Sequence, residues 1–270
     1  VGVIDTGIDY THTMLGGSGD TSVYSGIDPA KPSSLFPNKK VVGGIDIVGT
    51  DFNSGSLDFK QRILHPDLNP LDEAGHGSHV AGTVAGIGDG VQSYSGVAPE
   101  AVLYAIKVFG AGGSTSDEAV IAGLEYAADP DGDLSFKNQL DVVNLSLGSS
   151  YGDPHIMYSE AIRNLVNGGT VVVASAGNSG NQDYIVGAPS VANEAISVAA
   201  SIDGMDHNYK FRAVDFTLAN SEVLFEEMIE GAVTKPISVS DFSTGELVYI
   251  GIADKDLSPD LAAALSGKVA

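Results

Sequence analysis

Short apolar runs alternate with helix-like segments over most of the first 200 residues of the chain. The runs are typical of buried strands and lie at residues 1–4, 41–48, 102–108, 142–147, 170–174 and 195–199. Between them, small and apolar residues recur at helical spacing at 77–86, 116–128 and 154–167. Because helices that connect parallel strands cover the faces of their sheet, this order predicts an α/β fold, with a mostly parallel sheet and helices on both faces.

Two parts of the chain depart from this alternation. Residues 11–75 are rich in Gly, Ser, Pro and Asp, which predicts long surface loops around the single strand at 41–48. After about residue 203 the pattern predicts only strands at 211–216 and 247–252 and a short helix at 259–265. We therefore expect a first domain at 1–203 and the beginning of a β-rich second domain at 204–270. Apolar runs at both ends of the sequence indicate that both domains continue beyond it.

The net charge of the chain argues against nucleic acids and anionic membranes as partners. Thirteen Lys and Arg against 35 Asp and Glu give a net charge of −22, which repels nucleic acids and anionic lipids. A content of 43% hydrophobic and 18% charged residues, without an apolar run long enough to span a bilayer, predicts a folded chain with no membrane insertion. The absence of cysteine excludes disulfides, a thiolate nucleophile and zinc–thiolate sites together.

Polar residues follow three of the predicted strands. They are Asp5, the stretch 144–148 and the pair Gly177-Asn178. In open α/β sheets, ligands bind at the carboxyl ends of the strands, so we expect these residues to meet in one crevice. An Asp after a strand is most often a cap or turn residue, and Asp5 alone is therefore weak support for a site.

Two histidines, His76 and His79, stand three residues apart at the start of the predicted helix. One interpretation is a metal pair, because residues at this spacing share a helix face, but no third ligand matches them. The other interpretation makes His76 a catalytic base, with a buried carboxylate such as Asp5 fixing its tautomer. The glycines on both sides of His76 allow backbone to approach closely, and we expect His79 to be a core histidine.

Asn178 follows the most apolar of the predicted strands and is flanked by small residues. An Asn at such a position is usually a turn former. Its amide can also donate a hydrogen bond to an oxyanion, and loss of one such donor typically costs about 3 kcal/mol of transition-state stabilisation.

Taken together, four stretches of this sequence resemble the subtilisin-like serine proteases. They are Val3-Ile-Asp-Thr-Gly7, Gly75-His-Gly-Ser-His-Val-Ala-Gly82, Asn144-Leu-Ser-Leu-Gly148 and Ala174-Ser-Ala-Gly-Asn178. The resemblance covers about residues 1–203 and implies a serine endopeptidase that acts through an acyl-enzyme. It implies that Asp5 orients His76, that His76 is the general base and acid, and that Asn178 is the oxyanion-hole donor.

The same resemblance implies where a peptide or protein substrate binds. An extended peptide would lie between the backbones of 113–115 on one side and 146–148 on the other, as an added β-strand. Ser175 and Gly177 would line the main specificity pocket, although tight packing of small residues is the alternative. The implied substrate-binding residues are Gly113, Ser114, Thr115, Ser146, Leu147, Gly148, Ser175 and Gly177.

The segment from about Asp206 resembles the start of a protease-associated insert, as found in large secreted or cell-envelope members of the family. The similar stretches are 247–251 and 266–270. The resemblance thus implies a secreted or cell-envelope location.

The chain departs from the family pattern in one respect that concerns the chemistry. No Gly-Thr-Ser-Met-Ala-like motif follows Asn178, so we expect the nucleophilic serine to lie beyond this sequence and the sequence alone to be inactive. The alternative is a catalytically inactive module that binds peptides in the same cleft. Thr13-Met14 also replaces a Pro-Asp pair whose Asp commonly binds calcium in the family.

The run Asp129-Pro-Asp-Gly-Asp133 resembles the first half of a calcium loop. Position twelve of such a loop would be Leu140 rather than Glu, which favours a solvated acidic turn. A structural calcium ion held by Asp129, Asp131 and Asp133 remains the other interpretation, and no cofactor is expected for catalysis.

Overall fold

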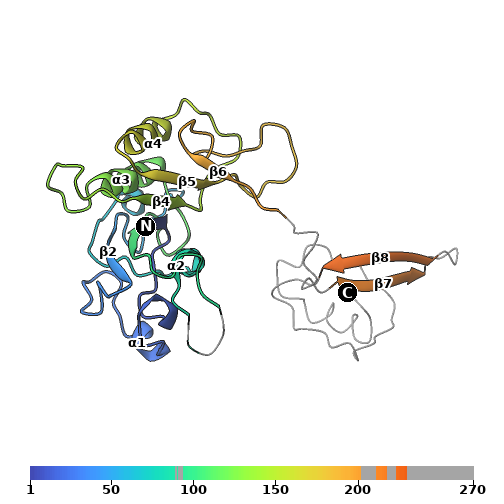
Figure 1. The fold of residues 1–270 in the computed structure, drawn as a ribbon, viewed down its shortest axis with the longest axis horizontal. Coiled ribbons are helices and arrows are strands. Elements are labelled where there is room, and N and C mark those ends of the chain that lie inside the picture. Colours follow the sequence, from blue (N-terminus) through green and yellow to red (C-terminus); the bar gives the residue numbers. More distant parts are fainter. Residues whose placement is uncertain (89, 91–93, 202–210, 218–222, 230–270) are drawn as a thin grey trace. The chain divides into compact units, whose positions relative to one another are not determined.

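The computed structural model describes residues 1–88, 90, 94–201, 211–217 and 223–229. It divides the chain into two compact units, Val1–Ala200 and Ser201–Ala270 (Figure 1). The predicted domain boundary after residue 203 lies close to this division.

Six parallel strands form the sheet of the first unit. They are β1 (Gly2–Asp5), β2 (Val41–Asp46), β3 (Leu103–Lys107), β4 (Val142–Leu145), β5 (Val171–Ser175) and β6 (Ile196–Val198). Their order in the sheet is β2-β3-β1-β4-β5-β6. Because β1 lies between β3 and β4, the chain connections diverge on either side of it, and the carboxyl end of β1 faces the crevice where such sheets bind ligands.

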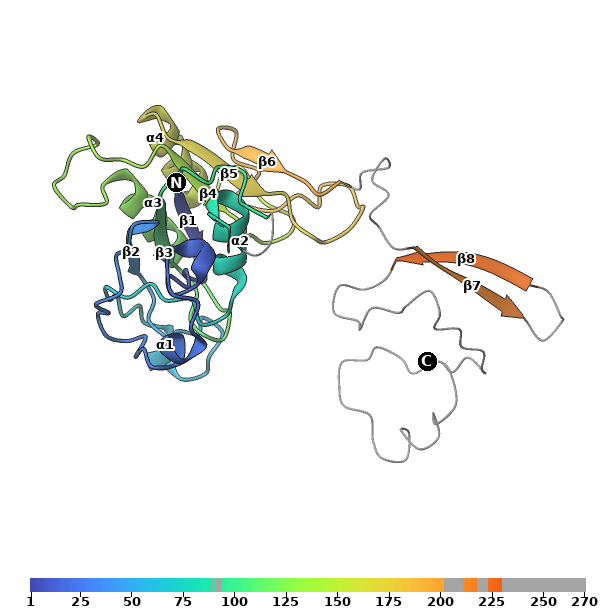
Figure 2. The same cartoon turned by 60° about the horizontal axis from the view of Figure 1, so that its bottom comes forward.

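Helices cover both faces of this sheet, as the alternating pattern predicts. Helix α2 (His76–Ala85) packs on one face, and α3 (Asp117–Ala128) and α4 (Met157–Asn167) pack on the other (Figures 1 and 2). The period of two along β1 explains this arrangement, since Val3 packs with the α2 side and Ile4 with the α3 and α4 side.

Helix α2 approaches the sheet through small residues at a spacing of four. Gly77, Ala81 and Ala85 are its buried positions, whereas His79 between them is exposed. The prediction that His79 is a core histidine is therefore wrong. On a helix of 3.6 residues per turn, a stripe with this spacing leaves a residue midway between its members on the opposite side.

The long segment 11–75 contains more structure than its composition predicts. Besides β2 it forms η1 (Thr13–Leu15), α1 (Thr21–Ser25) and η2 (Phe59–Arg62), which are too short to leave a periodic signal. Buried side chains also anchor it. The Tyr10 hydroxyl donates to Asn69 Oδ1 at 2.7 Å, and Asn69 Nδ2 donates to the carbonyls of Asp28 and Lys31.

In the second unit, β7 (Phe211–Thr217) and β8 (Val223–Ile229) form an antiparallel pair, which confirms the strand predicted at 211–216. The strand predicted at 247–252, the helix predicted at 259–265 and the stretch 266–270 lie outside the described residues. None of the helices in the described part is both long and apolar enough to cross a membrane.

Candidate active site

Asp5 and His76 meet at the carboxyl edge of the sheet. Asp5 is the last residue of β1 and is fully buried, and His76 is the first residue of α2. The distance between His76 Nδ1 and Asp5 Oδ1 is 2.7 Å, and the N–H of Thr6 donates to the same oxygen at 2.7 Å. The His76 side chain is 58% exposed, and with Nδ1 engaged its Nε2 is the ring nitrogen left for proton transfer.

The surroundings of Asp5 disfavour its ionised form. Burial raises the pKa of Asp5 above its ordinary value, and the hydrogen bonds from His76 and Thr6 offset only part of that effect. Its Oδ2 is buried and has no hydrogen-bond partner among the described residues. A positive charge on the His76 ring, whose Nδ1 lies 2.7 Å from Asp5 Oδ1, would relieve this penalty.

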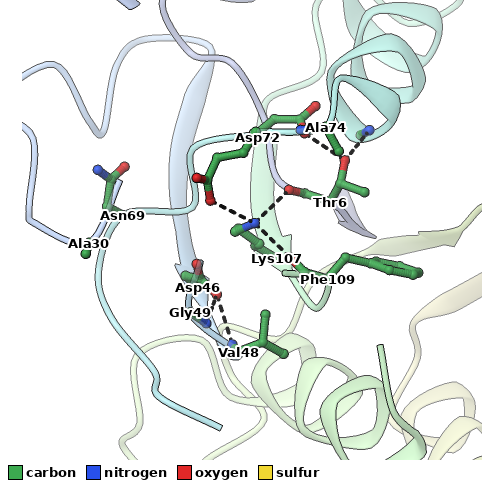
Figure 3. Close-up of polar contacts among 12 residues, drawn as sticks. Thr6, Ala30, Asp46, Val48, Gly49, Asn69, Asp72, Ala74, Lys107 and Phe109 are labelled. Carbon is green, nitrogen blue, oxygen red and sulfur yellow. Dashed lines mark hydrogen bonds and ion pairs between the residues drawn. The ribbon is translucent and has the colours of Figure 1, made fainter. Parts of the chain in front are cut away.

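A second buried carboxylate, Asp72, attaches the start of α2 to the end of β1. Asp72 Oδ1 accepts from the N–H groups of Ala74 and Gly75 and, at 2.8 Å, from the hydroxyl of Thr6 (Figure 3). Its Oδ2 accepts from the N–H and the hydroxyl of Ser78 at 2.8 and 2.7 Å. Burial raises the pKa of Asp72, but these donors outweigh it and the net pKa is lowered.

The glycines on the two sides of His76 serve this attachment in different ways. A Cβ on Gly77 would lie 2.1 Å from the carbonyl oxygen of Gly7, and the Gly77 N–H donates to Thr6 Oγ1 at 2.8 Å. Gly75 has a φ of 91°, in the left-handed region that glycine adopts readily. The expected close approach of backbone is therefore confirmed at Gly77 but not at Gly75, where no atom lies within 4 Å of a Cβ and only the backbone angle favours glycine.

The metal interpretation of the two histidines finds no support in the structure. His76 contacts Asp5, whereas His79 is exposed. In the part of the chain that the structure describes, Asp129, Asp131 and Asp133 form the one cluster of three or more potential metal ligands.

The ends of β1, β4 and β5 bring the other predicted residues to the same edge. Ile4 pairs with Leu145, and Leu145 pairs with Ala174, so Asp5, Ser146 and Ser175 follow the paired positions at one level of the sheet. Gly177, with a φ of 105°, and Asn178 follow one residue after the end of β5 and are exposed.

The loop after β3 carries Gly113, Ser114 and Thr115. The Ser114 hydroxyl contacts the hydroxyl of Ser54 at 2.8 Å, and the Thr115 hydroxyl donates to the Val108 carbonyl. Gly113 is exposed and has a φ of 73°. With both hydroxyls turned into the protein, this stretch presents mainly its backbone, which is the feature that a peptide strand would need.

The facing loop after β4 is tied to the end of β5. Ser175 Oγ donates to the Leu147 carbonyl at 3.3 Å. A segment that the sequence reasoning missed joins the two: Ser149 and Ala188 exchange two backbone hydrogen bonds at 3.0 Å, and the Gly187 N–H donates to the Ala176 carbonyl. A Cβ on Gly187 would lie 2.4 Å from the Ser149 carbonyl oxygen. The Gly187-Ala188 pair was the only sequence signal for this close approach.

The acidic run after α3 folds as a tight turn. One carboxylate oxygen from each of Asp129, Asp131 and Asp133 lies within 4.8 Å of the others. Asp129 accepts from the N–H groups of Asp133 and Leu134, which holds the turn together without a metal ion. The cluster has a donor set that suits calcium, but it lies largely exposed.

The chain is similar to several known proteins. A family model described as "Subtilase family" matches residues 1–265. The chain is 38% identical over 202 residues to minor extracellular protease Vpr of Bacillus subtilis (strain 168), which covers 74% of this chain and 20% of that protein. It is 34% identical over 217 residues to subtilisin DY of Bacillus licheniformis, with coverage of 79% and 60%.

Among solved structures, sphericase matches with a TM-score of 0.51 and 25% identity, covering 84% of this chain and 57% of that chain. The sequence thus spans between a fifth and three fifths of these proteins.

Proposed function

The chain belongs to the subtilase family, and from this premise we propose that the whole protein is a serine endopeptidase that hydrolyses peptide bonds through an acyl-enzyme. The observation that carries the proposal is the 2.7 Å contact between His76 Nδ1 and the buried Asp5. This is the geometry in which a histidine with a fixed tautomer can activate a hydroxyl nucleophile.

In the proposed mechanism, His76 Nε2 takes the proton of a serine hydroxyl as its oxygen attacks the carbonyl carbon of the scissile bond. Asp5 holds the ring and stabilises the imidazolium, and the Asn178 amide donates to the oxyanion of the tetrahedral intermediate. His76 then gives its proton to the leaving amine as the C–N bond breaks. A water molecule hydrolyses the resulting ester by the same steps, with His76 again acting as base and then acid.

We place the nucleophilic serine beyond Ala270. No Gly-Thr-Ser-Met-Ala-like stretch follows Asn178 in this sequence, and the sequence spans 60% of subtilisin DY. The sequence alone is therefore proposed to be inactive.

We place the substrate peptide between residues 113–115 and 146–148, with Ser175 and Gly177 lining the main specificity pocket. The backbone presented by Gly113 and the ties between Leu147 and Ser175 support this placement. Gly187 lies next to Ser149 and Ala176, and we add it to the pocket as part of its floor.

Residues 204–270 are proposed to begin a protease-associated insert, and the protein is proposed to be secreted or attached to the cell envelope. One relative is named an extracellular protease, which supports the location. The stretches 247–251 and 266–270 that suggest the insert lie outside the described residues.

A longer gene product that extends past Ala270 tests the proposal. We expect it to be labelled by a fluorophosphonate and to cleave a peptide substrate, and we expect the His76→Ala variant to do neither, because both reactions need an activated serine. If the longer product binds peptides but is neither labelled nor active, the alternative of an inactive peptide-binding module replaces this one.

A further inference from the structure

A buried lysine lies beside the candidate dyad without a part in the mechanism above. Lys107 is the last residue of β3 and is 1% exposed. In the sheet it pairs with Asp5 of β1 and with Asp46 of β2. A buried ammonium group is costly unless it is paired, so a lysine at this position requires partners.

The ammonium group of Lys107 has three partners in three segments of the site (Figure 3). Nζ donates to the Phe109 carbonyl at 2.7 Å and to the Thr6 carbonyl at 3.3 Å, and it lies 3.5 Å from Glu73 Oε2. Two of its three N–H donors are thus engaged by carbonyls, whereas the Glu73 contact is an ion pair, since Glu73 Oε2 has no hydrogen-bond partner among the described residues.

Each partner adjoins a different part of the proposed active site. Thr6 directly follows Asp5, and Glu73 lies three residues before His76 in the loop that leads into α2. Phe109 leads into the loop with Gly113, which we place along the substrate. The lysine therefore links the orienting carboxylate, the approach to the base and one wall of the cleft, over sequence separations as large as 101 residues.

We propose that Lys107 is a positioning residue of the peptidase, which fixes the spacing between the dyad and the wall at 113–115. The inference rests on the proposed function, because it assigns Lys107 to that same site. Without the ammonium group, the two carbonyls and Glu73 would lose their common partner and the three segments could move apart. A shift of about 1 Å in such a site can cost about 100-fold in rate.

A second buried lysine, at the amino ends of the strands, provides a matched control for Lys107. Lys40 is 5% exposed, and its Nζ donates to the carbonyls of Pro99 and Ala101 at 2.7 and 2.6 Å. It precedes β2, so it lies at the amino ends of the strands. Lys40→Met and Lys107→Met thus each remove a buried ammonium held by two carbonyls, but only the second touches the site.

The first measurement is peptide hydrolysis by the longer gene product. For Lys107→Met we expect kcat to fall roughly 30- to 100-fold at a temperature where the variant is folded, because the dyad and the substrate no longer align. For Lys40→Met we expect kcat within about twofold of the wild type, with a comparable fall in unfolding temperature. Equal kcat values in the two variants would overturn the proposal.

The second measurement is proton NMR on the same longer gene product and does not depend on its activity. The proton shared by His76 Nδ1 and Asp5 gives a low-field resonance in proton NMR when the ring is charged. We expect the wild type and Lys40→Met to share its chemical shift, and Lys107→Met to show it displaced or lost. An unchanged resonance in Lys107→Met would refute the positioning role.

Glu73→Gln provides a milder variant if Lys107→Met does not fold. It removes only the charge from the third partner, and we expect a three- to tenfold lower kcat with a displaced resonance. Wild-type values of both would contradict the proposal. An inactive wild-type longer product would instead refute the proposed function, while the NMR comparison would still decide the placement of Lys107.

Discussion

Different charged side chains are buried at the carboxyl ends and at the amino ends of the six parallel strands, which are here called the carboxyl edge and the amino edge of the sheet. Five charged side chains are buried in the described part of the chain, and four of them, Asp5, Asp46, Asp72 and Lys107, lie at or beside the carboxyl edge. Lys40 lies alone at the amino edge, where two carbonyls satisfy it. By contrast, Asp5 and Asp46 each retain one buried oxygen with no partner among the described residues.

This difference shows at which end of the strands the fold buries charged groups that are not fully satisfied. Burial raises the pKa of Asp5 and, despite the nearby Lys107, raises the pKa of Asp46 to about 6. Such perturbed carboxylates cluster at functional sites, whereas Lys40, which two carbonyls satisfy far from the dyad, needs only a structural explanation. The contrast between the edges can be tested by four further changes.

The largest effect is expected for Asp5→Asn in the longer gene product. We expect kcat to fall about 10⁴-fold, because the amide favours the wrong tautomer of His76. We expect the unfolding free energy at neutral pH to change by less than about 1 kcal/mol, since burial already disfavours the charge of Asp5. Peptide hydrolysis and urea unfolding measure the two. A large loss of stability would show that Asp5 is structural rather than functional.

The next effect is expected for Asp72→Ala, which leaves the N–H groups of Ala74, Gly75 and Ser78 without their acceptor. We expect a loss of about 2 to 4 kcal/mol in unfolding free energy and a roughly tenfold or larger fall in kcat. Asp20→Ala is the control, because Asp20 caps the exposed helix α1. Asp20→Ala should lower the unfolding free energy by less and leave kcat unchanged. Equal effects of the two substitutions would show that Asp72 has no special role in attaching α2.

The lowered pKa of Asp72 also gives this prediction a pH dependence. The stabilisation by a carboxylate with a lowered folded-state pKa is present above its unfolded pKa and is lost as the pH falls through the folded one. The stability gap between wild type and Asp72→Ala should therefore shrink in acid, as urea unfolding below about pH 4 would show.

Asp46→Asn should change the free energy of unfolding in the opposite direction, by stabilising the protein. Burial raises the pKa of Asp46 to about 6 in the folded wild type, whereas in the unfolded chain the pKa keeps its ordinary value of 3.8. The stability of the wild type therefore falls as the pH rises between these two values. The amide oxygen can still accept from the Val48 and Gly49 N–H groups (Figure 3). We expect the variant to be more stable than the wild type by about 2 to 3 kcal/mol at pH 7.

Urea unfolding at about pH 4 and at pH 7 checks this prediction, since the gap should be small in acid and should widen between the two. A gap that does not change with pH would show that Asp46 ionises normally in the folded protein. It would also weaken the electrostatic contrast between the two ends of the sheet, which would then depend on Asp5.

The smallest effect is expected at the acidic turn, which lies between α3 and the amino end of β4. If Asp129, Asp131 and Asp133 bind calcium, millimolar calcium should raise the unfolding temperature of the wild type by roughly 1 to 3 °C, and should not do so for Asp131→Asn. Asp153→Asn, at an exposed acid outside the turn, is the control. The same calcium effect in all three proteins would exclude the turn as a site.

Much of the fold was predictable because its signals are local. The strands and helices could be recognised from a period of 2 or 3.6 residues. The site residues could be found from the same elements, since Asp5 and Asn178 lie at the ends of predicted strands and His76 lies at the start of a predicted helix. The short helices η1, α1 and η2 were missed because single turns carry no periodicity. His79 was misplaced because the apolar neighbours on its helix pointed to burial on every side.

The sequence by itself determined the strands and long helices of the first unit, the family and the residues of the dyad, since each of these signals lies in a continuous stretch. Only the tertiary structure decided that Asp72 would bond to Thr6, 66 residues away, and that Lys107 would bond to Thr6, 101 residues away. The physical reason is the strand order. Which side chains meet at a sheet edge depends on which strands become neighbours, and no local pattern along the chain encodes that choice.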